Sequence, residues 1–246
     1  MKPVLIATPR SGSTIIGELI GDLAVQLWGS KGWLNEFFNI NQNLVTEVKI
    51  INDRLYLQRN QYVDQPWCLD VSRERQIRKQ YVDNDPNYVI KFLVSQVEDW
   101  TVDWITENNY TPIFVERRDK IKQLLSFLTS KKTNSWYYHK SRENQPVTEI
   151  IYDEETALKL VWILREYKVL KNKFKNPITI YYEDFIDKGG NQKAIAEILG
   201  IGETFIETQT DSAVTPYLKD PESLISNDQA WLEAKDRITK LLNQIL

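Results

Sequence analysis

Four short apolar runs along the chain predict β-strands. They span Pro3–Thr8, Tyr88–Val94, Pro112–Val115 and Ile178–Tyr182. The first run begins almost at the first residue and is apolar at consecutive positions from Val4 onward. Such a continuous run is typical of a strand that is buried on both faces of its sheet.

Between and after these runs, apolar residues recur every three or four positions, which predicts amphipathic helices. The helical segments are Asp119–Lys131, Asp153–Phe174, Asn191–Leu199 and Pro221–Leu246. In the second segment, the apolar residues at this spacing are Leu160, Leu164, Tyr167, Leu170 and Phe174. Strands that alternate with helices indicate βαβ units. The predicted fold class is therefore α/β, with three α/β/α layers around a central parallel sheet of about four or five strands.

The 246 residues, of which 42% are hydrophobic, can bury one substantial core, so residues 1–246 are predicted to form a single domain. Two polar and aromatic segments with weak periodicity, near residues 31–60 and 134–147, are predicted to be loops. Ligands of parallel α/β folds bind beyond the carboxyl ends of the strands, so we expect these loops to border a ligand-binding site. A C-terminal helix is predicted near residues 221–246.

The amino-acid composition of the chain argues against several classes of function. The net charge of −3 is made of interspersed positive and negative residues, which argues against a nucleic-acid partner. No segment resembles a membrane span or a secretory signal. The chain has one cysteine, Cys68, and one histidine, so neither a disulfide framework nor a zinc site is expected. These features predict a soluble cytoplasmic protein.

The strongest local signal lies directly after the first strand, where residues 8–14 read TPRSGST. Pro9 and Gly12 interrupt the strand, and Thr14 is predicted to cap a helix. The apolar positions of that helix are Ile15, Ile16, Leu19, Ile20, Leu23 and Leu27. Because backbone N–H groups converge at a helix N-terminus with the helix dipole behind them, this strand–turn–helix unit predicts an anion-binding site.

The side chains of the same turn suit a phosphate. Ser11, Ser13 and Thr14 add hydroxyl donors, and Arg10 adds a fixed positive charge. The turn lacks the Gly-Lys-Ser/Thr sequence of a Walker A motif, and Arg10 precedes Gly12, whereas the lysine of a P-loop kinase follows a glycine. We therefore predict a P-loop-like nucleotide-binding architecture that differs from that of a P-loop kinase.

A second phosphate-binding pair is predicted where the strand Pro112–Val115 ends. The chain continues through Glu116–Asp119 into a helix, which places Arg118 at the strand end and Ser126 two turns into the helix. The two residues are separated by roughly 12 Å of helix rise, and an arginine side chain can fold back to share one phosphate with the serine hydroxyl. Two separate phosphate sites suit a nucleotide that is phosphorylated at both ends of its ribose.

These motifs resemble those of the sulfotransferases that use 3′-phosphoadenosine-5′-phosphosulfate (PAPS). TPRSGST resembles their 5′-phosphosulfate loop, and RRDKIKQLLS (Arg117–Ser126) resembles their 3′-phosphate motif, in which a serine follows an arginine eight positions later. YYEDF (Tyr181–Phe185), followed by a helix ending in ILGI (Ile198–Ile201), is similar to the later strand–helix unit of the family. The resemblance extends from Lys2 to about Ile201 and is closest in style to bacterial carbohydrate and glycolipid sulfotransferases.

The resemblance implies that a sulfuryl group moves from PAPS to an acceptor hydroxyl by in-line displacement, releasing adenosine 3′,5′-bisphosphate (PAP). It implies that Arg10 stabilises the leaving phosphate and that Ser11–Thr14 bind the 5′ end of the cofactor. Arg118 and Ser126 correspond to the residues that bind the 3′-phosphate. No metal is expected to be required, because a sulfuryl group carries less charge than a terminal phosphoryl group.

The general base departs from the commonest pattern of the family. Many members use a histidine after a central strand, but the matching strand here reads VIKFLVSQ and has Lys91 without a histidine. Other branches use a glutamate soon after the first helix, which corresponds to Glu36 in GWLNEFFN (Gly32–Asn39). Its aromatic neighbours would desolvate the carboxylate and raise its pKa toward a useful range. Glu36 is the predicted base, with His139 as an alternative, and Lys91 is a candidate for neutralising the sulfuryl oxygens.

Three further segments have less specific patterns. The aromatic residues Trp136–Tyr138 could stack on an acceptor or anchor a loop. Glu183 and Asp184 are expected to cap the following helix. Lys219 lies in a loose motif that could return a basic residue to the 3′-phosphate.

The sequence leaves the acceptor open among a hydroxyl-bearing small molecule, a carbohydrate, a lipid and a tyrosine side chain. An exposed aromatic loop would be compatible with a homodimer. Two other functions are also compatible with the sequence. One is an ATP-dependent, P-loop kinase-like phosphotransferase, which would need Mg²⁺, and the other is a non-catalytic nucleotide-binding module.

Overall fold

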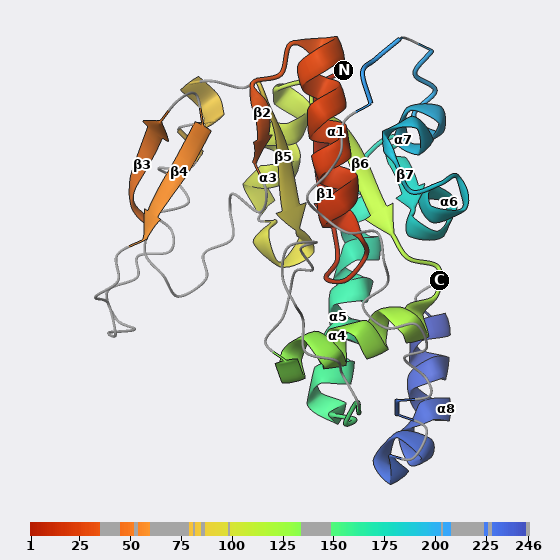
Figure 1. Cartoon of the computed structure of the whole chain (residues 1–246). Helices are drawn as coiled ribbons and strands as arrows, with labels where there is room; N and C mark the ends of the chain where they lie inside the picture. The colour runs from red at the N-terminus through yellow and green to blue at the C-terminus, as the bar shows by residue number, and fades with distance from the viewer. Residues whose placement is uncertain are drawn as a thin grey trace.

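A central sheet of five parallel strands organises the molecule (Figure 1). The computed structural model describes residues 1–34, 45–51, 54–59, 79–80, 82–84, 87–97, 99–133, 149–202, 204–207, 224–225 and 228–244. The strands stand in the order β2-β5-β1-β6-β7. Their bounds are Pro3–Ala7 for β1, Gly32–Leu34 for β2, Tyr88–Leu93 for β5, Thr111–Glu116 for β6 and Ile178–Tyr181 for β7. The central strand β1 is fully buried, as its continuous apolar run predicts.

Helices cover both faces of this sheet, because alternate side chains of each strand point to opposite sides. The helices are α1 (Ser13–Trp28), α3 (Asp99–Glu107), α4 (Lys120–Thr133), α5 (Glu154–Lys171), α6 (Tyr182–Asp187), α7 (Gln192–Ile198) and α8 (Gln229–Asn243), with a 3₁₀ turn, η2, at Val94–Gln96. On one face, Leu5 packs with residues of α1 and α7, and on the other face Ile6 packs with residues of α3 and α5. The three-layer α/β/α fold predicted from the sequence is therefore confirmed.

A third apolar cluster lies among α4, α5 and α8. It includes Leu125 and Leu128 of α4, Leu164 of α5, and Trp231 and Ile238 of α8. Figure 1 shows α4 across the carboxyl edge of the sheet, next to the loop that joins β1 to α1. The fold thus brings the helix after β6 to the edge where parallel α/β folds bind ligands.

The four predicted strands correspond to β1, β5, β6 and β7. Three of the predicted helical segments contain α5, α7 and α8, and the segment Asp119–Lys131 overlaps α4, which extends to Thr133. Within its segment, α8 begins at Gln229 because the Asp228 side chain accepts a hydrogen bond from the Trp231 N–H. The short helices α3 and α6 were not predicted. Within the described residues, none of the helices combines the length and the apolar character that a membrane crossing requires.

The prediction of an irregular loop near residues 31–60 is wrong for three segments. Residues Gly32–Leu34 form β2, a parallel edge strand that pairs with β5. Val45–Ile51 and Arg54–Arg59 form β3 and β4, an antiparallel pair separate from the main sheet. A three-residue strand is too short for a periodic pattern, so its place depends on the neighbouring strand rather than on its own sequence. The loop predicted near residues 134–147 lies outside the described residues.

Candidate functional site

The loop between β1 and α1 has an unusual backbone. Arg10 has φ 62° and Gly12 has φ 81°, both in the left-handed region. A side chain at Gly12 would collide with the ring of Tyr182, so glycine is required there for space as well as for conformation. These two reversals turn the chain sharply from the strand into α1, whose first N–H groups have no partner within the helix.

Gly12, rather than Thr14, is the N-cap of α1. No side chain caps this helix, and Thr14 lies within its first turn. The prediction that Thr14 caps the helix is therefore wrong, because the left-handed backbone of Gly12 starts the helix earlier than the hydroxyl residue. The hydroxyl of Thr14 is instead available to other partners.

Two side chains hold the loop in shape. The Ser11 hydroxyl, fully buried, donates a hydrogen bond of 2.9 Å to the carbonyl oxygen of Thr8. From α4, the buried amide of Gln123 donates to the Thr8 hydroxyl at 2.8 Å and to the Pro9 carbonyl oxygen at 2.7 Å. Because the Ser11 proton is engaged inside the loop, this hydroxyl stabilises the turn rather than presenting a donor outward. These hydrogen bonds fix the backbone of the loop between Thr8 and Ser11.

A buried lysine lies under the first turn of α1. Lys91 stands on β5, next to β1, and only 1% of it is exposed. Its Nζ donates a hydrogen bond of 3.1 Å to Oγ1 of Thr14. A buried ammonium requires polar partners, and this one finds a hydroxyl of the predicted phosphate-binding turn. The structure therefore places a buried lysine against the turn that contains Arg10.

The helix α4 contacts the same loop through Ser126. Nε of Arg10 donates a hydrogen bond of 2.9 Å to Oγ of Ser126, although the two residues are 116 positions apart. Because the serine oxygen accepts this bond, its own proton can be donated to another group. The two segments that were predicted separately to bind phosphate are therefore in direct contact.

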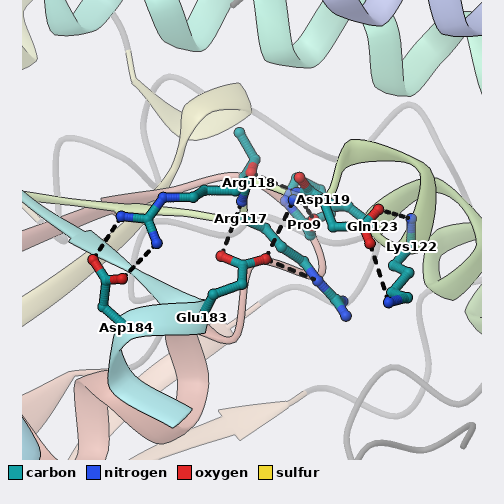
Figure 2. A network of polar contacts seen from close by, with 9 residues as sticks. Pro9, Arg117, Arg118, Asp119, Lys122, Gln123, Glu183 and Asp184 are labelled. Carbon is teal, nitrogen blue, oxygen red and sulfur yellow. Dashed lines mark hydrogen bonds and ion pairs between the residues drawn. The ribbon is translucent and has the colours of Figure 1, made fainter. Parts of the chain in front are cut away.

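Arg118 is oriented differently from what its spacing to Ser126 suggested. Its NH1 and NH2 donate to the two carboxylate oxygens of Asp184 at 2.5 and 2.7 Å (Figure 2). Its guanidinium also lies 4.1 Å from the centre of the Tyr181 ring. The hydrogen bond from Arg118 holds the pKa of the Asp184 carboxyl below its usual value of 3.8. Arg118 is thus turned toward Asp184, whereas Ser126 is turned toward Arg10.

The carboxylates of α6 are not caps of the following helix. Glu183 accepts hydrogen bonds from the backbone N–H groups of Arg118 and Asp119 at 3.0 and 3.3 Å (Figure 2). Glu183 and Asp184 lie in the first turn of α6, and it is the Asn191 side chain that caps α7. The capping prediction is wrong because these side chains reach across to the turn after β6 instead of forward along the chain.

Sequence reasoning missed two residues that shape the site. Gln123 was not among the predicted site residues, although it is fully buried and holds the loop through Thr8 and Pro9. Tyr181 belongs to a segment that was quoted only for its resemblance. Arg117 also lies near the loop, 5.2 Å from the centre of the Tyr182 ring.

Several predicted site residues lie outside the described residues. They are the candidate bases Glu36 and His139, the aromatic residues Trp136–Tyr138, and Lys219. Their predicted roles stay predictions, as does the expectation that no metal is required.

The described site is a strand–turn–helix unit with buried polar supports from Gln123 and Lys91, and Arg10 lies in its turn. Arg10, Lys91 and the N-terminus of α1 are arranged so that an anion at the turn would meet positive charge and backbone N–H groups. Fold and site together define an α/β protein with a strand–turn–helix unit at the carboxyl edge of its parallel sheet.

In comparisons with known proteins, no family model matches the chain, and no curated protein sequence matches it significantly. The resemblance to PAPS-dependent sulfotransferases therefore rests on the quoted motifs. The fold by itself does not select a function, so the function is argued from the site.

Proposed function

We propose that this chain is a sulfotransferase that moves a sulfuryl group from PAPS to an acceptor hydroxyl and releases PAP. The observation that carries the proposal is the hydrogen bond from Nε of Arg10 to Oγ of Ser126. It joins the segment that resembles the 5′-phosphosulfate loop to the segment that resembles the 3′-phosphate motif. Both lie at the carboxyl edge of a parallel sheet, where nucleotides bind in such folds.

In the proposed reaction, the acceptor oxygen attacks sulfur in line with the departing phosphate. The new O–S bond forms as the bond from sulfur to the phosphate oxygen breaks, and the acceptor proton passes to a base. Negative charge grows on the leaving phosphate oxygen, so positioning and positive charge supply the catalysis. Arg10 would stabilise that oxygen.

Lys91 supports the same chemistry from below the turn. Its Nζ is fixed by Thr14 and is shielded from water, which strengthens its attraction for an anion bound at the start of α1. Lys91 would neutralise the sulfuryl oxygens as the bond to the phosphate breaks. Glu36 is the proposed base, and His139 remains the alternative.

The acceptor is proposed to be a hydroxyl-bearing small molecule, a carbohydrate or a lipid. We also propose that the protein is cytoplasmic, that the reaction needs no metal ion, and that the chain forms a homodimer. The selectivity for one acceptor would be set by the segments predicted as loops near residues 31–60 and 134–147.

Calorimetric titration tests the cofactor class. We expect the wild-type chain to bind PAP in the presence of EDTA, and Arg118→Ala to weaken this binding by roughly tenfold to a hundredfold, because a charge-assisted hydrogen bond to phosphate is lost. Arg165→Ala, at an exposed arginine of α5, is the matched control and should leave binding unchanged.

The same titration with ADP and Mg²⁺ tests the alternatives. A preference for ADP with Mg²⁺ would favour a kinase-like phosphotransferase, and no binding of either nucleotide would reject the sulfotransferase proposal. Binding of PAP without transfer from PAPS to any acceptor of the three classes would favour a non-catalytic module.

A further inference from the structure

We infer that Asp184 and Tyr181 are positioning residues that hold the guanidinium of Arg118 ready for the 3′-phosphate of the cofactor. The inference rests on the proposed function and deepens it, because it names what lets the site distinguish a 3′-phosphorylated nucleotide from one without that group. It starts from the assembly around Arg118 at the end of β6 (Figure 2).

The contact with Asp184 occupies one edge of the guanidinium. NH1 and NH2 face the two carboxylate oxygens, which is an end-on bidentate pair. A guanidinium has five N–H donors, so the edge formed by Nε–H and an outer N–H is left over. Among the described residues, no contact involves Nε of Arg118. That edge can take two oxygens of a phosphate while Asp184 keeps the other.

Tyr181 and Glu183 fix the remaining freedom of Arg118. The Tyr181 ring lies against the guanidinium, with 4.1 Å between the Arg118 Cζ and the ring centre, which sets the plane of the fork. Glu183 holds the backbone N–H groups of Arg118 and Asp119. An arginine side chain is long and loses much rotamer freedom when it binds, so a side chain that is already ordered binds its anion at a lower entropic cost.

Asp184 has two opposite effects on a phosphate bound to Arg118. Its negative charge repels the phosphate, and its hydrogen bonds orient the guanidinium that binds the phosphate. The side chains of Arg118 and Asp184 are 50% and 40% exposed, so water screens the repulsion between the carboxylate and a phosphate on the far edge of the guanidinium. The hydrogen bonds that orient Arg118 are short-range and are kept. Orientation should therefore outweigh repulsion.

The test compares PAP with adenosine 5′-monophosphate, which lacks the 3′-phosphate. Affinities of both nucleotides are measured by calorimetry in EDTA for the wild type, Asp184→Ala, Asp184→Asn and Tyr181→Ala. Asp187→Ala, an exposed acidic residue of the same helix, is the matched control. Circular dichroism checks that each variant is folded, and Asp184→Asn keeps the size of the side chain if the alanine variant is not.

We expect Asp184→Ala to lower the affinity for PAP about tenfold and to leave the affinity for the monophosphate unchanged. The ratio of the two affinities should therefore fall. The affinity ratio of Asp184→Asn should lie between those of Asp184→Ala and the wild type. Tyr181→Ala should also lower the ratio, whereas Tyr181→Phe, which keeps the aromatic ring, should retain the wild-type ratio.

Two results would overturn the inference while leaving the proposed function in place. Tighter binding of PAP by Asp184→Ala would mean that the carboxylate competes with the phosphate for Arg118. An equal loss for both nucleotides would mean that Asp184 only stabilises the fold. A wild-type chain that does not prefer PAP to the monophosphate would instead reject the proposed function, and the inference with it.

Discussion

At the scale of single residues, Arg10 stands in a backbone conformation that a non-glycine residue rarely adopts. Its φ of 62° costs roughly 1–2 kcal/mol relative to ordinary conformations. The hydrogen bond from its side chain to Ser126 offsets part of this cost, and Gln123 holds the neighbouring Pro9. Strained residues that the surrounding structure holds in place gather at functional sites, which agrees with the role proposed for Arg10.

The ion pair of Arg118 and Asp184 gives a pH dependence with a definite sign. Hydrogen bonding to Arg118 lowers the pKa of Asp184 in the folded chain below its usual 3.8. The pair therefore stabilises the fold above that unfolded-state pKa, and the contribution is lost as the pH falls through the lower, folded-state pKa. We expect Asp184→Asn to be less stable than the wild type at about pH 5, and the difference to shrink below about pH 4.

Urea unfolding of the wild type and Asp184→Asn at a series of pH values measures this difference. The effect should be small, since both side chains are partly exposed. Asp187→Asn is the control and should track the wild type at every pH. A difference between wild type and Asp184→Asn that stays constant across the acid range would contradict the assignment to this ion pair.

At the scale of elements, the packing of α1 against β2 depends on two glycines. Gly17 and Gly21 lie one turn apart in α1, and a Cβ atom on either would overlap with Trp33 of β2. The absence of side chains lets the indole lie directly on the helix backbone. This contact explains how a strand of three residues keeps a defined place at the edge of the sheet.

Replacing Gly17 by alanine should therefore reverse the usual effect of this substitution. In an open helix interior, alanine in place of glycine stabilises by about 1 kcal/mol. Here overpacking against Trp33 should destabilise by about 1–3 kcal/mol in the free energy of unfolding. The measurement is urea unfolding of Gly17→Ala, Trp33→Ala and the double variant.

In the double-mutant cycle, Gly17→Ala should become neutral or stabilising when Trp33 is alanine, because the collision is gone. A destabilisation by Gly17→Ala that is the same in both backgrounds would mean that Trp33 is not its cause.

At the scale of the whole molecule, the site is coupled to folding because it joins distant parts of the chain. The helix α4 contacts the β1–α1 loop through Gln123 and Ser126, and the same helix packs through Leu125 and Leu128 against α5 and α8. A nucleotide bound at this edge would contact only the folded arrangement. Ligand binding should therefore stabilise the molecule as a unit.

We expect PAP at a hundredfold excess over its Kd to raise the free energy of unfolding by about 2.7 kcal/mol. For a chain of this length, that corresponds to a rise in Tm of roughly 5–10 °C. Thermal unfolding with PAP and EDTA measures it, and the rise should be smaller for Arg118→Ala at the same concentration. A rise produced by ADP with Mg²⁺ and not by PAP would count against the proposed cofactor.

The sequence by itself determined the features that depend on neighbours along the chain. Continuous apolar runs identified four of the five strands of the central sheet, but not the separate pair β3 and β4, and the spacing of apolar residues identified the long helices. The turn at residues 8–14 was recognisable because its proline, glycine and hydroxyl residues act locally. These patterns involve residues that are close together in the sequence, so they can be recognised without knowing the rest of the fold.

The tertiary structure alone decided which distant groups meet. Arg10 contacts Ser126 across 116 positions, and Arg118 turns to Asp184 across 66, instead of toward the serine eight residues away. The edge strand β2 and the buried support from Gln123 likewise depend on elements that are far apart in the chain. A long polar side chain such as that of Arg118 can reach several partners, some of them close to it in the sequence. Only the packing of the helices against the sheet decides which partner it contacts.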